Sequence, residues 1–212
     1  MIEVNVINIK TPFLDQKPGT SGLRKSTLDF QRENYLEIFI ESILLSFDNL
    51  KEATLVVGGD GRYGNLEAIE KIVQICVANK VKKIIVPKDG LLSTPATSHL
   101  IRKKNAIGGI ILSASHNPGG INGDFGVKLN ISNGGPAPEQ ITHKIFKFSQ
   151  SLTSYKISKI KIPDLSKLGL FSYADTALEI VNGLEDYSNL MEKLFDFDQI
   201  SDFLKKDFSL IF

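Results

Sequence analysis

The residues best suited to chemistry gather in one glycine-rich segment, residues 113–128 (SASHNPGGINGDFGVK). Ser115 offers a hydroxyl group, His116 follows it directly, and Lys128 adds a positive charge at the end. A phosphorylated serine carries roughly −1.5 to −2 charges, which an imidazole and an ammonium group nearby would stabilise. The segment is therefore a candidate site of phosphoryl transfer. The plainer alternatives are a serine that satisfies turn hydrogen bonds, an exposed turn histidine and a solvated lysine.

The backbone of two loops suits a phosphate or sugar ligand. Four glycines and a proline lie within Pro118–Gly126, and residues without side chains let backbone N–H groups approach a ligand closely. The loop Lys17–Lys25 (KPGTSGLRK) shares this character, and its Arg24 carries a planar fork of donors that matches phosphate oxygens. A solvated basic loop has a similar composition, so this second loop by itself leaves both interpretations open.

A third glycine motif, Gly59–Gly64 (GDGRYG), has the spacing G-x-G-x-x-G. Dinucleotide-binding folds show this spacing between a strand and a helix, with an acidic residue about 20 residues further on. Here the acidic residue, Asp89, comes later than that and lies in an expected turn. We favour the alternative, in which Asp60 and Arg62 pair with each other and hold the loop.

Several other kinds of site are excluded by the sequence. It contains no Gly-Lys dipeptide for a Walker-type P-loop and no G-x-S-x-G motif for a hydrolase elbow. Its 3 histidines are scattered, and a single cysteine, Cys76, forms neither a disulfide framework nor a cysteine-rich zinc site. That cysteine count also favours a reducing compartment.

The charge balance limits the class of partner. The 25 Lys and Arg residues against 24 Asp and Glu residues give a net charge of +1. Long-range attraction to nucleic acid or to an acidic membrane is therefore not expected, and any anion must be held by a local cluster. No apolar run approaches the roughly 20 residues that a membrane-spanning helix needs. We expect a cytoplasmic protein with no nucleic-acid or membrane partner.

Strands and helices are expected to alternate along the chain. The apolar patterns predict strands at 2–9, 54–57, 83–87, 107–112 and 124–130, and helices at 31–47, 66–78, from 94 onward, 138–149 and within 186–206. Periodicity is weak between 151 and 185. This order indicates an α/β fold with a largely parallel sheet, whose ligands bind at the carboxyl ends of the strands. Function is therefore expected near residues 58–62 and 113–128.

Four segments carry a family resemblance: residues 16–25 (QKPGTSGLRK), 57–62 (VGGDGR), 114–120 (ASHNPGG) and 122–138 (NGDFGVKLNISNGGPAP). In this order and spacing they resemble the N-terminal domain of the α-D-phosphohexomutases, in particular the eukaryotic-type phosphoglucomutase branch. The likeness runs from about Thr11 to Phe203. It implies an α/β, three-layer domain with a mixed, largely parallel sheet flanked by helices, which is domain I of that family.

The resemblance implies an enzyme of the isomerase class in carbohydrate metabolism. Such an enzyme interconverts glucose 1-phosphate and glucose 6-phosphate through a phosphoserine and a glucose 1,6-bisphosphate intermediate. Ser115 matches the serine that carries the phosphoryl group, and its phosphate is expected to contact one Mg²⁺ ion. Lys128 matches a lysine that assists proton transfer, and His116 matches a residue beside the transferring group.

The resemblance also assigns residues to phosphate and substrate binding. Arg24 matches the loop arginine that contacts phosphate, and Thr20, Ser21 and Asn117 are expected to bind the hexose phosphate with it. One departure is Ser113, where the family usually has threonine, a change that keeps the hydroxyl group.

A larger departure is length, because the family's full chain is more than twice as long. Its magnesium loop, sugar-recognition loop and distal phosphate-binding loop have no counterpart here. Residues 1–190 are therefore expected to form the catalytic-serine domain, and 191–212 a linker helix and the first strand, Phe208–Phe212, of a truncated second domain. We expect the remaining metal ligands to come from other domains of a parent chain, and the isolated 212 residues to be inactive.

Two other functions stay open at this point. The chain is alternatively a non-catalytic phosphoprotein related to the mutases, which uses phosphorylation of Ser115 for regulated association. The intact set of Arg24, Ser115 and Lys128 argues mildly against that role. The third possibility is a dinucleotide-binding module built on Gly59–Gly64. The hexose preference is not determined by this sequence.

Overall fold

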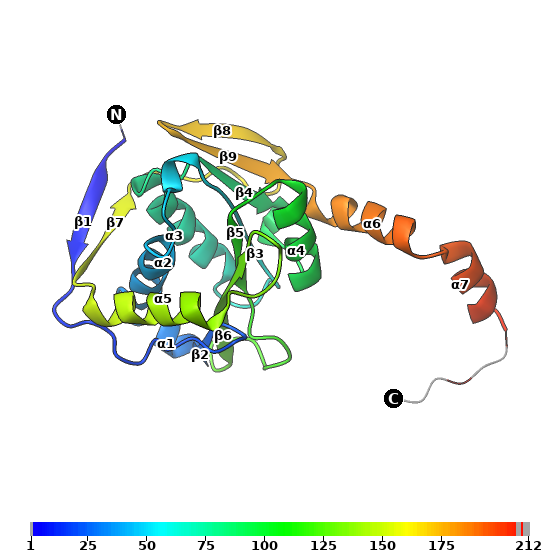
Figure 1. The fold of residues 1–212 in the computed structure, drawn as a ribbon, viewed down its shortest axis with the longest axis horizontal. Helices are drawn as coiled ribbons and strands as arrows, with labels where there is room; N and C mark the ends of the chain where they lie inside the picture. Colours follow the sequence, from blue (N-terminus) through cyan, green and yellow to red (C-terminus); the bar gives the residue numbers. More distant parts are fainter. Residues whose placement is uncertain (1, 207–208, 210–212) are drawn as a thin grey trace.

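The computed structural model describes residues 2–206 and 209. Short apolar runs form strands and longer amphipathic stretches form helices, and from α2 to α5 their order is the one that the sequence predicts (Figure 1). The elements are β1 Val4–Asn8, β2 Leu23–Ser26, α1 Thr27–Phe30, α2 Tyr35–Leu44, η1 Leu50–Glu52, β3 Thr54–Gly59, α3 Asn65–Ala78, β4 Lys83–Pro87, η2 Lys88–Gly90, α4 Thr94–Lys103, β5 Gly108–Leu112, β6 Asp124–Ile131, α5 Glu139–Ser151, β7 Ser154–Ser158, β8 Gly169–Tyr173, β9 Thr176–Val181, α6 Gly183–Leu194 and α7 Phe197–Leu204.

The main sheet has 7 strands in the order β2-β6-β5-β3-β4-β9-β8. Its four central strands, β5, β3, β4 and β9, run parallel, with Val56 opposite Gly109 and Ile85 opposite Glu179. The strands at both edges pair antiparallel: β2 with β6, β6 with β5, and β8 with β9. The expectation of an α/β fold with a mixed sheet is confirmed. The parallel strands form the centre of the sheet.

Alternation along the central strands separates two cores. Leu55 and Val57 of β3 belong to the larger cluster, whereas Val56 between them belongs to the smaller one. The larger cluster contains the apolar faces of α2 and α3, and the smaller one contains that of α4. Helices therefore cover both faces of the sheet, and the three-layer arrangement is confirmed.

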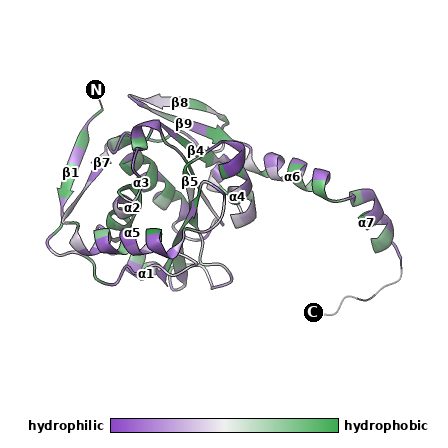
Figure 2. Ribbon diagram, viewed as in Figure 1, coloured by the Kyte–Doolittle hydropathy of each residue, from purple (hydrophilic) through white to green (hydrophobic). Residues whose placement is uncertain are grey.

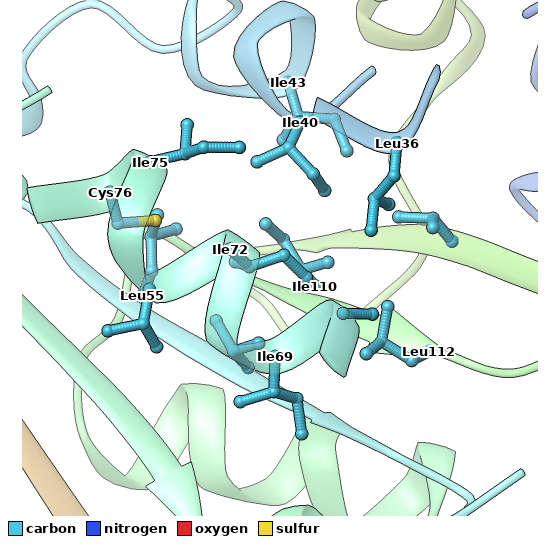
Figure 3. Close-up of a cluster of buried hydrophobic side chains, with 14 of the residues drawn as sticks. Leu36, Ile40, Ile43, Leu55, Ile69, Ile72, Ile75, Cys76, Ile110 and Leu112 are labelled. Carbon is cyan, nitrogen blue, oxygen red and sulfur yellow. The ribbon is translucent and has the colours of Figure 1, made fainter. Parts of the chain in front are cut away.

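Figure 3 shows part of the larger core, where side chains of α2, α3 and the sheet meet. The labelled side chains are Leu36, Ile40 and Ile43 of α2, Ile69, Ile72, Ile75 and Cys76 of α3, and Leu55, Ile110 and Leu112 of the sheet. Full burial of one such aliphatic side chain stabilises the fold by roughly 1.5–3 kcal/mol. The hydropathy colouring of Figure 2 shows the same division, with the hydrophobic faces of these helices turned inward.

Local sequence signals predicted the starts of two helices to within one residue. The helix expected from residue 94 is α4, whose N-cap Ser93 accepts a hydrogen bond from Ala96 N at 3.3 Å. Proline in its first turn suits a helix start, because the missing N–H group would have no partner there. The expected helix 66–78 is α3, which begins one residue earlier, at Asn65.

Three expectations about local structure were wrong. The expected loop Lys17–Lys25 is not loop throughout, because β2 begins at Leu23. The expected helix 31–47 is shorter, Tyr35–Leu44. The weakly periodic region 151–185 contains three strands, and β9 lies inside the main sheet beside β4. Strands β7 and β9 pair with strands far away in the sequence, β1 and β4, so their placement depends on contacts that local periodicity does not show.

The chain leaves the body of the domain in two consecutive helices, α6 and α7 (Figure 1). The expectation of one or two helices within 186–206 is confirmed. Among the described residues, no helix is long and apolar enough to cross a membrane. The strand expected at Phe208–Phe212 lies outside the described residues, apart from Ser209. The division of the chain at residue 190 stays a prediction.

Candidate active site

Two loops meet where the central parallel strands end. Strands β3 and β5 are neighbours, with Gly59 opposite Leu112, so the segments that follow them leave the sheet at the same edge. Asp60 N donates to the carbonyl oxygen of Leu112 at 3.1 Å and joins the two strand ends directly. The expectation that 58–62 and 113–128 lie together is therefore confirmed.

Ser115 lies three residues after the end of β5, in an exposed turn. Its φ angle of 59° is left-handed, a conformation that costs a residue with a side chain roughly 1–2 kcal/mol. Its N–H group donates to Ser113 Oγ at 3.0 Å, and its carbonyl oxygen accepts from Arg62 Nη2 at 3.2 Å. Both backbone groups of Ser115 are thus held, while its hydroxyl makes no hydrogen bond to any described residue.

The rest of the loop is tied together by its own polar groups. Asn117 Nδ2 donates to Asp124 Oδ2 at 2.6 Å, and Asp124 N donates to the carbonyl oxygen of Pro118 at 2.8 Å. Thr27 Oγ1 donates to the carbonyl oxygen of Gly120 at 2.8 Å from the start of α1. The amide of Asn117 therefore supports the loop in this structure. His116 lies beside Ser115 and is exposed.

Arg24 and Lys128 reach one face of the sheet from neighbouring strands. Arg24 of β2 is opposite Gly126 of β6, which makes Lys128 its diagonal neighbour on that face. A Cβ atom at Gly126 would meet the carbonyl oxygen of Ser113 and approach Arg24 Cγ to 3.3 Å. The missing side chain of Gly126 thus lets Arg24 lie close to the strand that leads to Ser115.

These two cations have no counter-ion among the described residues, and Arg24 Nε is buried without a hydrogen-bond partner. Partial burial lowers the pKa of Lys128, and the positive charge of Arg24 lowers it further. Two neighbouring cations of this kind, one with an unused donor, fit a bound anion such as a phosphate.

The expected substrate loop turns sharply beside Lys128. Gly19 and Gly22 exchange two backbone hydrogen bonds of 3.0 Å, which places Thr20 and Ser21 at the exposed tip of the turn. A Cβ atom at Gly22 would lie 2.7 Å from Lys128 Cα. The structure brings this turn to Lys128. Among the described residues it records no hydrogen bond between Thr20 or Ser21 and Ser115.

The Gly59–Gly64 loop has the structural role that we favoured. Arg62 Nε and Nη2 donate to the two carboxylate oxygens of Asp60 at 3.0 and 2.8 Å. Burial acts to raise the pKa of Asp60, but hydrogen bonds from Arg62 and Ser113 outweigh it and hold the pKa below its ordinary value. A Cβ atom at Gly59 would meet Asn65 Oδ1, so this glycine permits tight packing.

From the sequence, no role at the Ser115 site was assigned to three residues that hold this loop. Ser113 binds the N–H group of Ser115, Arg62 binds its carbonyl oxygen, and Asp124 binds Asn117. A usable signal existed for Arg62 and Asp124, since both lie in the quoted family motifs. The contact between residues 62 and 115 depends on strand order, which no motif contains.

The described residues fit only part of a metal site. They contain no group of three or more His, Cys, Asp or Glu side chains arranged to hold a metal ion. The carboxylates of Asp60 and Asp124, which lie in the two loops of the site, accept hydrogen bonds from Arg62 and Asn117, respectively. A phosphate on Ser115 would supply hard oxygen donors of the kind that Mg²⁺ prefers. The donor set therefore suits at most one side of a magnesium site, whose other ligands would have to lie outside the described residues.

Comparison with known proteins places this geometry in a family. The model of the phosphoglucomutase/phosphomannomutase α/β/α domain I matches residues 15–156. The chain belongs to this family. The matched residues include the three segments of the site: 17–25 with Arg24, 59–64 with Arg62, and 113–128 with Ser115.

Within the phosphoglucomutase/phosphomannomutase family, the chain is similar to several phosphoglucomutases. It is 53% identical to the phosphoglucomutase of Emericella nidulans over 214 residues, and the match covers 100% of this chain and 38% of the relative. It is 55% identical to that of Aspergillus oryzae, covering 94% of this chain and 37% of the relative. The solved structure of the exocytosis-sensitive phosphoprotein parafusin, a phosphoglucomutase from Paramecium, matches with a TM-score of 0.87 at 42% identity, covering 93% of this chain and 38% of that one. The chain thus spans about 38% of the length of these relatives.

The neighbouring charge of Arg24 gives a testable effect on Lys128. Replacing Arg24 by glutamine is expected to raise the pKa of Lys128, because one cause of its lowering is removed. The measurement is NMR titration of the lysine after reductive ¹³C-methylation. The variant Arg32→Gln is the control, since Arg32 is paired with Asp15 and should leave Lys128 unchanged. An unchanged pKa in Arg24→Gln would contradict the coupling.

The lowered pKa of Lys128 also determines how the stability of the fold changes with pH. The folded chain releases the Lys128 proton below the ordinary pKa of 10.5, so the unfolded chain binds more protons in the alkaline range up to that value. Stability contributed by this group therefore rises with pH across that range. At neutral pH, the charged form of Lys128 slightly destabilises the fold, because its position is partly buried and lies beside another cation.

Proposed function

We propose that this chain supplies the phosphoserine-bearing part of a phosphoglucomutase, with Ser115 as the group that carries the phosphoryl. The observation that supports this most is the free, exposed Ser115 hydroxyl on a backbone-held turn, near a pair of cations without counter-ions among the described residues, in a domain whose relatives are phosphoglucomutases. The substrate class is a hexose phosphate, with glucose 1-phosphate and glucose 6-phosphate as the interconverted pair.

The proposed reaction transfers one phosphoryl group in each direction. The bond between phosphorus and Ser115 Oγ breaks while a bond forms to the free hydroxyl of the hexose phosphate. That hydroxyl loses a proton, Ser115 Oγ gains one, and glucose 1,6-bisphosphate is bound. After the bisphosphate reorients, its other phosphoryl group returns to Ser115 by the reverse exchange. Charge and atoms balance over the cycle, and the bisphosphate also primes an unphosphorylated chain.

Lys128 and His116 are proposed to handle protons and charge beside Ser115. The lowered pKa of Lys128 favours exchange of a proton near neutral pH more than an ordinary lysine would. His116, next in sequence and exposed, can donate to a phosphate oxygen on Ser115. Lys128 is therefore the first residue to test as a proton carrier.

Arg24, Thr20, Ser21 and Asn117 are proposed to bind phosphate and substrate. Arg24 has the donor geometry and the unpartnered Nε atom for this task. Thr20 and Ser21 present hydroxyl and backbone N–H groups at an exposed turn next to Lys128. Asn117 would first have to release Asp124, or bind through its backbone.

We propose one Mg²⁺ ion as cofactor, with a phosphate oxygen on Ser115 as the ligand from this chain. When bound, the ion neutralises charge that develops on the transferring phosphoryl group. Other domains of a longer parent chain are proposed to supply the remaining ligands and the sugar-binding loops. Accordingly, residues 1–190 form the catalytic-serine domain, 191–212 lead into a second domain, and the 212 residues alone turn over little substrate. A cytoplasmic location belongs to the same proposal.

The first test is to find the phosphate. The full-length protein is incubated with glucose 1,6-bisphosphate and Mg²⁺, and intact mass and peptide mapping follow phosphorylation. We expect one added phosphoryl group, located on Ser115, that is lost again on adding glucose 6-phosphate. A folded protein that takes up no phosphate, or takes it up on another serine, would overturn the proposal. The variant Ser93→Ala is the control, since Ser93 caps α4 and should not change labelling.

A second candidate function is a phosphoprotein that binds a partner when Ser115 is phosphorylated. The similarity to parafusin, which is described as a phosphoprotein as well as a phosphoglucomutase, favours keeping it. The two functions differ in turnover. A full-length protein that becomes phosphorylated on Ser115 but does not convert glucose 1-phosphate would support the second candidate.

A further inference from the structure

One polar network holds both backbone groups of Ser115. We infer that Asp60, Arg62 and Ser113 form a clamp that keeps Ser115 in its left-handed conformation and so positions its hydroxyl for phosphoryl transfer. In this clamp they act as positioning residues, because they act through the Ser115 peptide. The inference rests on the proposed function for its kinetic consequences and on geometry alone for its structural ones.

Arg62 is the central member of the clamp. Besides the hydrogen bonds of Arg62 to Asp60, its Nη2 atom donates to the carbonyl oxygen of Ser115 at 3.2 Å and its Nη1 atom donates to that of Asp124 at 2.6 Å. One guanidinium group thus joins the loop after β3 to the first and last parts of the Ser115 loop. Only a planar group with several donors can make these contacts together, so lysine cannot replace it.

The side chain of Arg62 is largely buried, which separates it from the substrate-binding cations. It is 6% exposed, and its donors are directed at oxygens of the protein. Arg24, by contrast, keeps a buried Nε atom without a partner. The two arginines therefore have different tasks: Arg24 is available to an anion, and Arg62 holds the loop.

Ser113 completes the clamp on the other side of Ser115. Its Oγ atom accepts a hydrogen bond from the Ser115 N–H group at 3.0 Å, and its hydroxyl is near enough to the Asp60 carboxylate to help lower the pKa of that group. Asp60 consequently binds Arg62 and lies close to Ser113, and these two residues hold the two backbone groups of Ser115. A left-handed serine persists only where its surroundings hold it there, and these three side chains supply that restraint.

A backbone hydrogen bond from Asn117 N to the carbonyl oxygen of Ala114, at 3.2 Å, also closes the turn that contains Ser115, and the side-chain contacts of the loop lie beyond that turn. Asn117 binds Asp124, and Thr27 binds the carbonyl oxygen of Gly120. They shape the segment 117–124 without reaching the Ser115 peptide. Loss of the clamp is therefore expected to move the nucleophile while the remainder of the loop keeps its shape.

The test compares variants of the full-length protein. Ser113→Ala removes the hydroxyl, Ser113→Thr keeps it, and Arg62→Lys keeps the charge but loses the fork. We expect Ser113→Ala and Arg62→Lys to lower kcat roughly 10- to 100-fold while KM changes less than about threefold, because a small displacement of the reacting atom mainly affects the transition state. Ser113→Thr, which keeps the hydroxyl group, should have a kcat close to that of the wild-type protein. Arg32→Lys, at a surface ion pair, is the control.

A second measurement separates failure of the clamp from failure of the proposed function. Hydrogen–deuterium exchange of residues 113–117 should rise in Ser113→Ala and Arg62→Lys but not in Ser113→Thr. Wild-type-like exchange and kcat in both variants would overturn the clamp, as would a loss that threonine does not restore. If the wild-type protein shows no mutase activity, the proposed function fails and exchange alone tests the clamp. If Arg62→Lys does not fold, the comparison of Ser113→Ala with Ser113→Thr still decides whether the clamp exists.

Discussion

Ser115→Ala is expected to abolish mutase activity in the full-length protein, with a loss on the order of 10⁴-fold or more in kcat. The alanine has no oxygen to carry the phosphoryl group, so neither half of the proposed cycle can run. Because the Ser115 hydroxyl makes no hydrogen bond to a described residue, its removal should leave stability nearly unchanged. The measurement is conversion of glucose 1-phosphate with glucose 1,6-bisphosphate present.

Two comparisons make this result specific. Ser93→Ala removes another serine hydroxyl, the N-cap of α4, and should cost about 1 kcal/mol of stability without affecting turnover. The phosphate label described above should be absent from Ser115→Ala. Ordinary turnover in Ser115→Ala would remove Ser115 from the mechanism and with it the proposed function.

Gly22→Ala is expected to destabilise the domain by about 3 kcal/mol, the sum of two effects. The φ angle of +86° is left-handed and strained for alanine, and the added Cβ atom would meet Val127 O and lie 2.7 Å from Lys128 Cα. Both contacts are with the backbone of β6, which cannot move aside cheaply. Urea-induced unfolding measures the loss, and activity should fall with it because Arg24 and Lys128 depend on this strand pairing.

Gly64→Ala is the matched control for that variant. Its φ angle of +83° is nearly the same, but the nearest atom to an added Cβ would be Phe125 Cε2 at an ordinary 3.7 Å. Only the conformational cost remains, roughly 1 kcal/mol. Equal losses in the two variants would show that the close approach of the turn to β6 does not matter, contrary to our expectation.

The strained serine and the crowded glycine show how the site combines accessibility and rigidity. The hydroxyl groups of Ser115, the proposed nucleophile, and of Thr20 and Ser21, the proposed binding residues, lie at exposed turns. The residues that hold those turns are buried or hydrogen-bonded. Such a division keeps the hydroxyls accessible to a ligand and limits the error in their position. The rigid part lies in the sheet edge formed by β2, β6 and β5.

Local sequence patterns were sufficient for the elements that carry most of the apolar residues. The runs that became β3, β4 and β5 are short and strongly apolar, and α3 and α4 have clear periodicity or caps. Each of these signals depends on residues within a few positions of one another. The α/β class and the sheet edge that bears the candidate site follow from this order of elements.

The family motifs determined which residues to examine at that edge. Ser115 and Lys128 lie in one continuous segment, and Arg24 lies in a loop of distinctive composition. The pairing of Asp60 with Arg62 was also predictable, because the two residues are two positions apart in a turn. The chemistry of these groups depends on residue type, which the sequence states directly.

Only the tertiary structure determined how these side chains interact with one another. Strand β9 could not be placed beside β4 from its own residues, and Arg62 reaches a carbonyl oxygen 53 residues away. The low pKa of Lys128 likewise requires Arg24 on the adjacent strand and a partly buried setting. Such contacts join segments far apart in the chain, and they depend on strand order and register, which arise from packing the whole sheet between its two layers of helices.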